Sequence, residues 1–456
     1  MLQPFAKADR IEYLRVFPLS LQSRHKRSAD GLEGRTVPLE ETLAKYSGFV
    51  DNDHGIISAL RHYDLPWEEA IHLCRVTLRP SACLAPSRSK HQISGCLLGK
   101  GTSRVAAEVS ALCEALERFS GIHRGDEERK RATYSELGDD AIHPSACTLF
   151  SEQQYREREK WNRREGKYNW VPEFFDERLP IDWSPVWSLS HHRVKYVPTA
   201  YCYFGYPFDS GHDFCRPDSN GNSAGNNLEE AIVHGFLELV ERECVALWWY
   251  NRVRRPGVDL DSFELDYVRK LQIAYDSFGR SFYVLDVTAA RSVPVFAAIS
   301  QSDDPTRHDH IFGFGAHFDP RLALLRAVTE LNQFLPEVVA RGYPSCQAPP
   351  SNHSFLIPTA DLAATRYSDF SYCPTRDLRD DVLGCANLVK QWGMEMLVLD
   401  QTRQDVGLPV VKVIVPGMRS WWARFAPGRL YSIPVRLSWL ESPLRENELN
   451  PDHISL

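Results

Sequence analysis

Residues 226–250 read NNLEEAIVHGFLELVERECVALWWY and carry the strongest helical pattern in the chain. Polar and apolar side chains separate onto two sides of this helix when successive residues are placed about 100° apart. With Asn226 at zero, the side at roughly 220° to 340° is apolar and is expected to pack in the core. The side at roughly 40° to 160° is polar, and it holds Glu230, Glu238, Glu241 and Arg242.

The spacing Glu-x-x-Glu-Arg at 238–242 occurs a second time at 114–118. The second copy lies in another predicted helix, over about residues 102–120, again among apolar and helix-forming residues. Its polar side chains fall within an arc of roughly 100°, and they are Ser110, Glu114, Glu117 and Arg118.

The charges on these helices allow two interpretations. Amphipathic helices often carry charge pairs three or four residues apart on a solvated face, and each helix taken alone fits that description. A third helix, predicted over about 320–340, adds Arg326 and Glu330 one turn apart. The repetition favours a binding site, because neighbouring carboxylates repel each other unless a divalent cation neutralises them. Carboxylate oxygens suit Mg²⁺ and arginines bind phosphate oxygens, so the pattern indicates a site for a magnesium-bound nucleotide.

Two loop motifs allow further interpretations. The segment 95–102 resembles a Walker A loop, but it has one residue too few between its glycines and Gly101 where Ser or Thr would bind the metal. A Gly-rich turn before a helix can still offer backbone N–H groups and Lys100 to an anion. A purely structural turn is the alternative.

The segment 221–225 fits the G-x-S-x-G motif of serine hydrolases. The polar, proline-containing residues before it argue against the strand that this motif needs, so contact with an anion or nucleotide is favoured.

Strand and helix signals alternate irregularly, which favours an α+β fold over a doubly wound α/β fold. Residues 1–48 have few periodic apolar positions, and we expect them to form an N-terminal extension to a single domain at 49–456. A Gly-rich turn is predicted at 94–101, and a further helix at 378–393. Strands are predicted at 71–78, 187–189, 194–203, 282–287, 293–300, 395–399 and 409–415.

The composition is that of a globular enzyme. The chain has 456 residues, of which 43% are hydrophobic and 25% charged, and this argues against a disordered or fibrous protein. The net charge of −7 argues against a nucleic-acid-binding function. No apolar run approaches the roughly 20 residues of a membrane span, and the start lacks the apolar region of a signal peptide. Eleven irregularly spaced cysteines without a C-x-x-C pair argue against disulfides or a zinc site, so we expect a cytoplasmic protein.

The motifs closely resemble the three ATP-site signatures of the YcaO family, in particular those of the cyclodehydratase branch that forms azoline rings in ribosomal peptides. Phrases typical of this branch are IDWSPVWSLS at 181–190, YVPTAYCYFGYP at 196–207 and PGMRSWWARFAPGRLY at 416–431. The resemblance covers about residues 48–451. It implies the YcaO-type ATP-binding fold, in which acidic helices surround a Mg-nucleotide site.

The resemblance also implies a role for each motif residue. The implied magnesium ligands are Glu114, Glu117, Glu230, Glu238 and Glu241. The implied nucleotide-binding residues are Ser110, Arg118, Ser223, Asn226, Glu230, Arg242, Arg326 and Glu330, to which the Gly-rich turn adds Lys100. Arg326 is also expected to take part in catalysis by balancing phosphate charge.

The reaction implied is the ATP-dependent conversion of Cys, Ser or Thr residues of a precursor peptide to thiazolines or oxazolines. The side chain attacks the preceding carbonyl carbon, the resulting oxyanion takes the γ-phosphoryl group of ATP, and phosphate leaves as the ring forms. Two alternatives remain open. One is a YcaO-type enzyme that forms thioamides or amidines, and the other is a non-catalytic scaffold subunit of a peptide-modifying complex.

The end of the chain departs from related azoline formers, because it keeps Leu-Asn-Pro at 449–451 and lacks the later alternating prolines. His453 titrates near neutral pH and is therefore our candidate for proton transfer there. We expect residues 1–48 to be too short for a leader-binding module, so a separate ubiquitin-activating-enzyme-like partner should present the precursor peptide. An FMN-dependent azoline dehydrogenase is a further candidate partner, and a homodimer or hetero-oligomer is expected.

Overall fold

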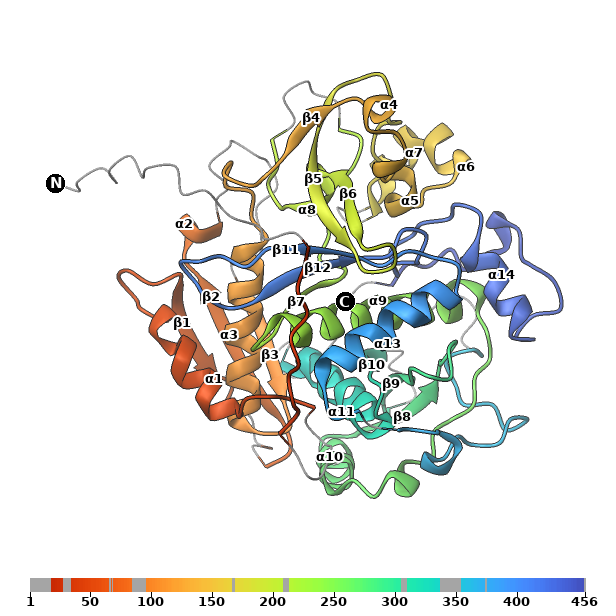
Figure 1. Cartoon of the computed structure of the whole chain (residues 1–456). Coiled ribbons are helices and arrows are strands. Elements are labelled where there is room, and N and C mark those ends of the chain that lie inside the picture. Colours follow the sequence, from red (N-terminus) through yellow and green to blue (C-terminus); the bar gives the residue numbers. More distant parts are fainter. Residues whose placement is uncertain are drawn as a thin grey trace.

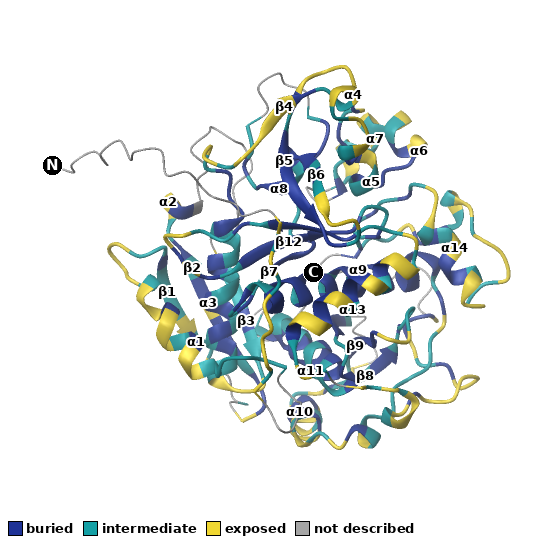
Figure 2. Cartoon of the chain, viewed as in Figure 1, coloured by how far each residue is buried: buried dark blue, intermediate teal, exposed yellow. Residues whose placement is uncertain are grey.

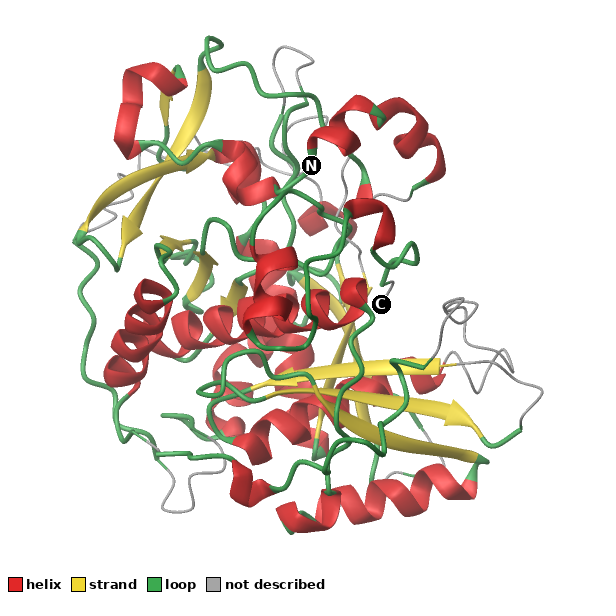
Figure 3. Cartoon of the chain, turned by 90° about the vertical axis from the view of Figure 1, so that its right-hand side faces the viewer, coloured by secondary structure: helices red, strands yellow, loops and turns green. Residues whose placement is uncertain are grey.

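The computed structural model of the chain describes residues 18–27, 34–64, 67, 69–83, 96–165, 169–207, 213–304, 310–336, 354–373 and 375–454. Over these ranges the strands form three separate antiparallel sheets, and helices occur between them in irregular order. Figure 3 shows helices in the middle of the molecule between the groups of strands and further helices at its edges. The predicted α+β class is therefore confirmed.

The first sheet supports the first acidic helix. Its strands lie in the order β1 (Ile57–His62), β2 (His72–Leu78), β3 (Cys96–Gly101). Helix α3 (Arg104–Ser120) covers this sheet, and α1 (Leu39–Tyr46) packs on α3. A Cβ atom on Gly99 would lie 2.2 Å from the backbone nitrogen of Ala111, so only glycine at this position allows β3 and α3 to approach so closely. Part of the predicted extension thus belongs to the same core as α3; the domain boundary at 48 stays a prediction.

The second sheet supports the third acidic helix. Its strands lie in the order β10 (His310–Ala316), β9 (Val295–Ser302), β8 (Arg280–Asp286). One face packs against α10 (Asp266–Ser277) and α11 (Pro320–Leu331). A Cβ atom on Gly315 would lie 2.2 Å from the carbonyl oxygen of Ala323, so glycine again permits close packing of a helix on its sheet. The opposite face of this sheet packs against the central helix.

The central helix is α9 (Leu228–Asn251), which lies in the middle of the molecule and is buried on nearly all sides (Figure 2). It contacts the second and third sheets, α13 (Leu378–Gln391) and α14 (Arg429–Arg436). The carboxylates of α9 therefore face the interior of the protein and not a solvated surface. Although α9 is long, no helix in the described part of the chain is apolar enough over a sufficient length to cross a bilayer.

The third sheet joins the C-terminal part of the chain to an upper region that holds β4–β6 and α4–α7 (Figure 1). Its strands lie in the order β4 (Lys130–Ala132), β5 (Ile181–Ser188), β11 (Leu397–Asp400), β12 (Val410–Ile414), β7 (Asn222–Ala224), and β6 (Arg193–Pro198) pairs with β5. The remaining short helices are α2 (Pro80–Cys83), α4 (Tyr134–Leu137), α5 (Pro144–Thr148), α6 (Glu152–Arg156), α7 (Arg158–Arg164) and α8 (Thr199–Cys202).

Most predicted elements are confirmed, and four differ from the structure. The strand predicted at 187–189 is the end of β5, which begins at Ile181. The Gly-rich segment at 94–101 is not a turn over its described residues, because 96–101 form β3. The strand predicted at 194–203 ends at Pro198, which has no N–H for the ladder and is followed by α8. The helix predicted to reach residue 340 is α-helical to Leu331 and then narrows to a 3-10 turn; residues 337–340 lie outside the described ranges.

Candidate active site

The three acidic helices α3, α9 and α11 meet around one cavity of about 600 Å³, which we call the main cavity. Its volume lies within the usual range for small-molecule pockets. Strand β3 completes its wall. The predicted site residues that line it are Lys100, Ser110, Glu238, Glu241, Arg242, Arg326 and Glu330. The structure thus brings together members of all three motifs, which lie far apart in the sequence.

Glu238 and Arg242 form a fixed ion pair on the wall of the main cavity. Arg242 Nη2 donates to Glu238 Oε1 over 2.8 Å, and the backbone N–H of Gly221 donates to the other carboxylate oxygen over 2.9 Å. The guanidinium of Arg242 lies 3.2 Å from the centre of the Trp421 ring, a cation–π contact that holds it flat. Its buried Nε has no hydrogen-bond partner in the part of the chain that the structure describes. Arg242 is therefore positioned in advance and keeps a donor for an anion.

Glu241 lies one turn from Glu238 and is almost fully buried. Burial raises the pKa of Glu241 to about 7, and the nearby Glu330 acts in the same direction, while Arg242 acts against it. The ordinary value for a glutamate is 4.5. A divalent cation at this place would favour the ionised carboxylate, so the environment of Glu241 would suit a metal ligand.

The cations on the opposite wall come from β3 and α11. Lys100 Nζ lies 3.6 Å from Glu330 Oε2, and the same oxygen accepts from the backbone N–H of Phe314 over 3.1 Å. Arg326 Nη1 donates to the carbonyl oxygen of Ala316 over 3.1 Å. Burial lowers the pKa of Arg326 to about 10, although Glu241 acts to raise it. A buried arginine of this kind would gain from an anionic ligand such as a triphosphate.

Of the predicted site residues on helix α3, Ser110 alone lines the main cavity. The hydroxyl oxygen of Ser110 accepts from the backbone N–H of Lys100 over 3.4 Å. Arg118 Nη2 lies 3.5 Å from Glu114 Oε1, and these two residues do not line the main cavity. Burial raises the pKa of Glu117 to about 8, and Glu114 adds to this rise while Arg118 opposes it. The acidic residues of α3 form a second carboxylate group that a cation would stabilise.

The motif before α9 is used differently from the nucleophile elbow of a hydrolase. Ser223 lies in β7, and its hydroxyl donates to the carbonyl oxygen of Ala231 over 2.6 Å, which holds the turn between β7 and α9 together. Asn226 donates to Glu230 over 3.3 Å. Glu230 is only 3% exposed, and its Oε2 has no partner among the described residues. Neither Ser223, Asn226 nor Glu230 lines the main cavity.

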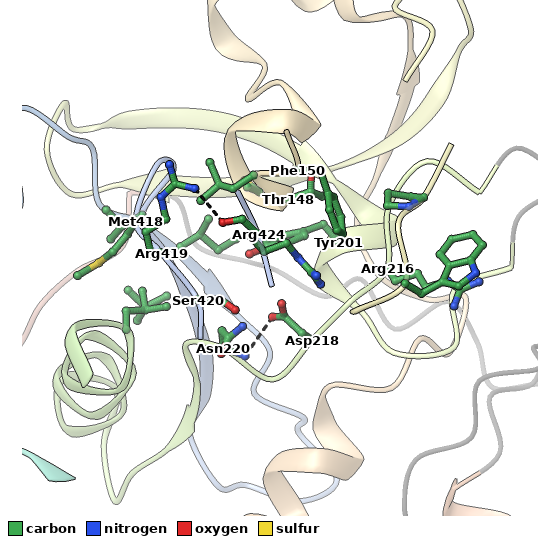
Figure 4. A pocket seen from close by; sticks show the side chains of 18 residues that line it. Thr148, Phe150, Tyr201, Arg216, Asp218, Asn220, Met418, Arg419, Ser420 and Arg424 are labelled. Carbon is green, nitrogen blue, oxygen red and sulfur yellow. Dashed lines mark hydrogen bonds between the residues drawn. The ribbon is translucent and has the colours of Figure 1, made fainter. Parts of the chain in front are cut away.

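A buried lysine supports the loop that holds Glu238. Lys412 Nζ donates to the carbonyl oxygens of Asp218 and Asn220 over 2.8 and 3.1 Å, which fixes the turn from which Gly221 donates. Beside this loop lies a small cavity of about 40 Å³, in which the side chains of Asp218 and Arg424 face each other (Figure 4). Its volume suits a few water molecules and not a nucleotide.

The residues present fit a magnesium ion that is shared with phosphate. All five predicted metal ligands are carboxylates, the hard oxygen donors that Mg²⁺ prefers. Within the described ranges, no three His, Cys, Asp or Glu side chains are already gathered into a metal site. A metal held by one or two of these carboxylates would complete its shell with phosphate oxygens and water, as Mg²⁺ usually does. The assignment of individual ligands stays a prediction.

His453 is anchored at a different place, near the C-terminal end of α9. Its Nε2 lies 3.1 Å from Glu165 Oε2, and its ring packs on Trp161. The preceding residue accepts a hydrogen bond at its carbonyl oxygen from the Trp249 indole over 2.6 Å. His453 is not among the residues that line the main cavity, and its role in proton transfer stays a prediction.

Several residues of the main cavity were not expected from the sequence. They include Arg35, His234, Tyr267 and His317. His234 falls at roughly 80° on the helical wheel of α9, between Glu230 and Glu238, so its place in the polar arc was a usable signal. Arg35 belongs to the segment expected to be an extension, and no motif marks it.

Comparison with known proteins agrees with this geometry. Residues 98–419 match the sequence model described as YcaO cyclodehydratase, ATP- and Mg²⁺-binding. The chain belongs to the YcaO family. The ATP and Mg²⁺ of the family correspond to the chemistry of the main cavity, where cations and carboxylates lie side by side.

The most informative structural relatives of this YcaO protein are heterocyclases. One, in complex with substrate and cofactor, is 43% identical with a TM-score of 0.89; the heterocyclase TruD is 43% identical with a TM-score of 0.77. Each alignment covers 96% of this chain, but it covers only 59% and 55% of those two longer chains. A YcaO protein from Methanopyrus kandleri bound with AMPPCP and Mg²⁺ shares the fold at 21% identity and a TM-score of 0.63, over 89% of this chain and 98% of that one.

Proposed function

We propose that this YcaO protein is an ATP-dependent cyclodehydratase that converts Cys, Ser or Thr of a ribosomal precursor peptide to thiazoline or oxazoline. The observation that carries the proposal is the meeting of three carboxylate-and-cation helices at one cavity, in a chain 43% identical to a heterocyclase. Phosphoryl transfer needs positioned charges more than a covalent protein catalyst, and the main cavity supplies such charges. Activation of the peptide amide oxygen by phosphorylation is the reaction that this arrangement serves.

The cations of the main cavity would hold the triphosphate. Lys100 and Arg326 approach from one wall and Arg242 from the other. Arg326 uses one of the five N–H donors of its guanidinium on Ala316, and Arg242 is held flat on Trp421. Fixed donors of this kind stabilise charge that develops during transfer without having to reorganise. Arg326 is therefore our candidate for the catalytic arginine.

Magnesium would be held by the carboxylates between these cations. Glu238 and Glu241 line the main cavity and are the proposed ligands there, whereas the roles that the resemblance implies for Glu114, Glu117 and Glu230, which do not line it, stay predictions. When bound, the ion neutralises phosphate charge and orients the γ-phosphoryl group. The raised pKa values of Glu117 and Glu241 support this proposal, because each carboxylate is poorly compensated by the protein alone.

The proposal extends to the partners of the chain. Microcin synthetase complexes, one of them with a pro-peptide bound, share the fold of this chain, and we take a separate ubiquitin-activating-enzyme-like protein as the partner that recognises the leader peptide. An FMN-dependent azoline dehydrogenase would follow where the product is oxidised. A homodimer or hetero-oligomer in the cytoplasm is the proposed working state.

An isotope experiment tests the reaction. The chain would be incubated with ATP, Mg²⁺ and a high concentration of the synthetic peptide Ala-Gly-Ile-Cys-Gly-Ala, with heavy oxygen in the amide carbonyl before the cysteine. We expect the peptide to lose the mass of one water and the heavy oxygen to appear in inorganic phosphate. Retention of the label in the peptide, or a gain in mass by exchange of oxygen for sulfur, would contradict cyclodehydration.

A pair of variants links the reaction to the main cavity. Arg326→Ala removes a cavity cation and should abolish label transfer to phosphate. Arg254→Ala makes the same change on the surface, where Arg254 pairs with the exposed Asp361 over 3.1 Å, and it should behave as wild type. Equal activity of the two variants would show that the main cavity is not the reaction site.

A further inference from the structure

A second cavity of about 360 Å³ lies beside the main cavity, between α9 and α13. His234 of α9 and His317, which precedes α11, line both cavities and form the wall between them. The second cavity mixes aromatic and apolar side chains with polar groups, as ligand pockets usually do. Among its lining residues are Ser292, Phe318, Phe370, Tyr372, Asn387 and Leu388.

The charges of the second cavity disfavour a nucleotide. Carboxylates outnumber cations on its wall, and Lys26 is already paired with Asp381. Glu230 is one of the residues that line this space, and its buried Oε2 has no hydrogen-bond partner among the described residues. Such an oxygen needs a donor, which a peptide backbone N–H supplies and a phosphate does not.

The two histidines between the cavities are held in opposite tautomers. His234 Nδ1 lies 3.3 Å from the carbonyl oxygen of Ala224, which can only accept, so Nδ1 carries the proton and Nε2 a lone pair. His317 Nδ1 lies 2.9 Å from the backbone nitrogen of Asp319, which can only donate, so the neutral ring carries its proton on Nε2. The wall therefore offers one proton acceptor and one donor.

Both rings are neutral at ordinary pH. Burial lowers the pKa of His234 to about 3, and the positive charges of Arg326 and Arg35 act in the same direction. Burial also lowers the pKa of His317 well below its ordinary value, with Arg326, His234 and Lys26 adding to the effect. A neutral imidazole has a lone pair that can accept a proton, and nearby phosphate groups would stabilise the positive charge that it then carries.

We propose that the second cavity holds the segment of the substrate peptide that carries the nucleophile, and that His234 Nε2 accepts the proton of that nucleophile. This inference rests on the proposed cyclodehydratase function. It assigns the main cavity to the nucleotide and the second cavity to the peptide, with the reacting atoms meeting at the two imidazoles.

The proposed step balances as follows. The Sγ–H or Oγ–H bond of the peptide breaks, its proton passes to His234 Nε2, and a new bond forms from S or O to the preceding carbonyl carbon. The π electrons of the carbonyl move onto oxygen, which His317 Nε2–H can stabilise by donation. This oxygen then takes the γ-phosphoryl group with release of ADP. The amide N–H proton passes to solvent as the C=N bond forms and inorganic phosphate leaves, and His234 returns its proton to phosphate or solvent.

A cavity-filling variant tests the peptide assignment. Gly384 of α13 lines the second cavity, and an added Cβ would meet no atom within 4 Å. Gly384→Trp should therefore fold, fill the cavity and lower peptide-dependent ATP turnover about tenfold or more, while AMPPCP binding stays unchanged. The matched control is Leu383→Trp, which places the same ring on the exposed side of the same helix. Wild-type turnover in the Gly384 variant would overturn the assignment.

A protection experiment tests the same cavity without catalysis. Cys373 lines the second cavity and is exposed, and Cys96 is an exposed thiol elsewhere that serves as internal control. With AMPPCP and Mg²⁺ present, the peptide Ala-Gly-Ile-Ser-Gly-Ala should slow alkylation of Cys373 by N-ethylmaleimide and leave Cys96 unchanged. If rings form in the isotope experiment with ATP but the peptide does not protect Cys373, the cavity assignment is wrong and the cyclodehydratase proposal stands. If the peptide protects Cys373 but no ring forms in the isotope experiment, the cavity assignment stands and the cyclodehydratase proposal falls. If neither is observed, both fall.

A substitution of the base tests the chemistry. Glutamine can still donate to Ala224 but cannot accept the proton of the nucleophile, so His234→Gln should retain AMPPCP binding and protection of Cys373 while losing ring formation. His191→Gln is the control, because His191 is an exposed ring paired with Glu395. Ring formation at the wild-type rate by His234→Gln would remove His234 from the mechanism. Loss of Cys373 protection in the same variant would show that the ring only shapes the cavity.

Discussion

Glu241 should destabilise the nucleotide-free protein at alkaline pH, and replacing it with glutamine should reverse that effect. Burial and Glu330 raise the pKa of Glu241 from 4.5 to about 7. A carboxyl group with a raised pKa stabilises the folded state most below pH 4.5, and this contribution is lost as pH rises through 7. At about 1.4 kcal/mol for each pKa unit, the full loss is roughly 3 kcal/mol.

Urea unfolding of the nucleotide-free protein at pH 5 and pH 8 measures this effect. Glutamine has the shape of glutamate without its charge, so Glu241→Gln should exceed wild type in free energy of unfolding by about 2 to 3 kcal/mol at pH 8 and by much less at pH 5. The control is Glu243→Gln on the same helix. Glu243 is buried and bound by Arg429, so its loss should destabilise the protein at both pH values. A Glu241 variant no more stable than wild type at pH 8 would refute the reasoning.

The Glu241→Gln variant also distinguishes a carboxylate that only destabilises the nucleotide-free protein from one that binds magnesium. ATP and Mg²⁺ together should stabilise wild type by about 2.7 kcal/mol at a ligand concentration a hundredfold above Kd. Glu241→Gln should lose a large part of this gain if Glu241 is a metal ligand. An undiminished gain would leave Glu241 as a strained carboxylate with no part in binding magnesium.

Three further outcomes are expected. Arg242→Lys keeps the charge but loses the flat contact with Trp421, so the KM for ATP should rise about tenfold; an unchanged KM would show that this contact does not position the cation. Deleting residues 452–456 removes the acceptor of the Trp249 indole and His453, and it should slow cyclisation strongly while ATP binding changes little; ring formation at the full-length rate would identify the tail as passive. The purified chain should modify a precursor peptide slowly at low concentration and faster with its leader-binding partner, and efficient leader-dependent processing by the chain alone would contradict that division of labour.

The acidic helices could be predicted because their signals are local. The spacing of apolar and charged residues placed α3 and α9 almost to the residue, and the wheel of α9 separated its packing side from its carboxylates. Strand β10 was missed because Gly313 and Gly315 weaken a strand signal, although both are needed for α11 to pack closely on the sheet. The β3 segment was interpreted as a turn for the same reason. Glycine at a close helix–sheet contact and glycine in a turn look alike in one sequence.

The composition of the site was predictable, but its division into cavities was not. Residue types and spacing indicated carboxylates and arginines for a nucleotide, and the structure brings members of all three motifs to the main cavity. No local pattern could show that Glu230 faces the second cavity or that Arg35 reaches the main cavity from the N-terminal segment. These positions depend on how separate helices and strands pack together, and the spacing of apolar residues within one element carries no information about that packing.

The main cavity lies between elements that belong to different hydrophobic cores. Helix α3 packs in the core of the first sheet, α11 in that of the second, and α9 in the central core. Carboxylates from these helices repel one another when no cation is present, so the nucleotide-free protein is strained where its three parts meet. A magnesium-bound triphosphate would contact all three helices at once and turn that repulsion into shared attraction. Binding should therefore increase the cooperativity of unfolding as well as the stability, because the ligand links the three helices across a cavity in which their carboxylates otherwise repel one another.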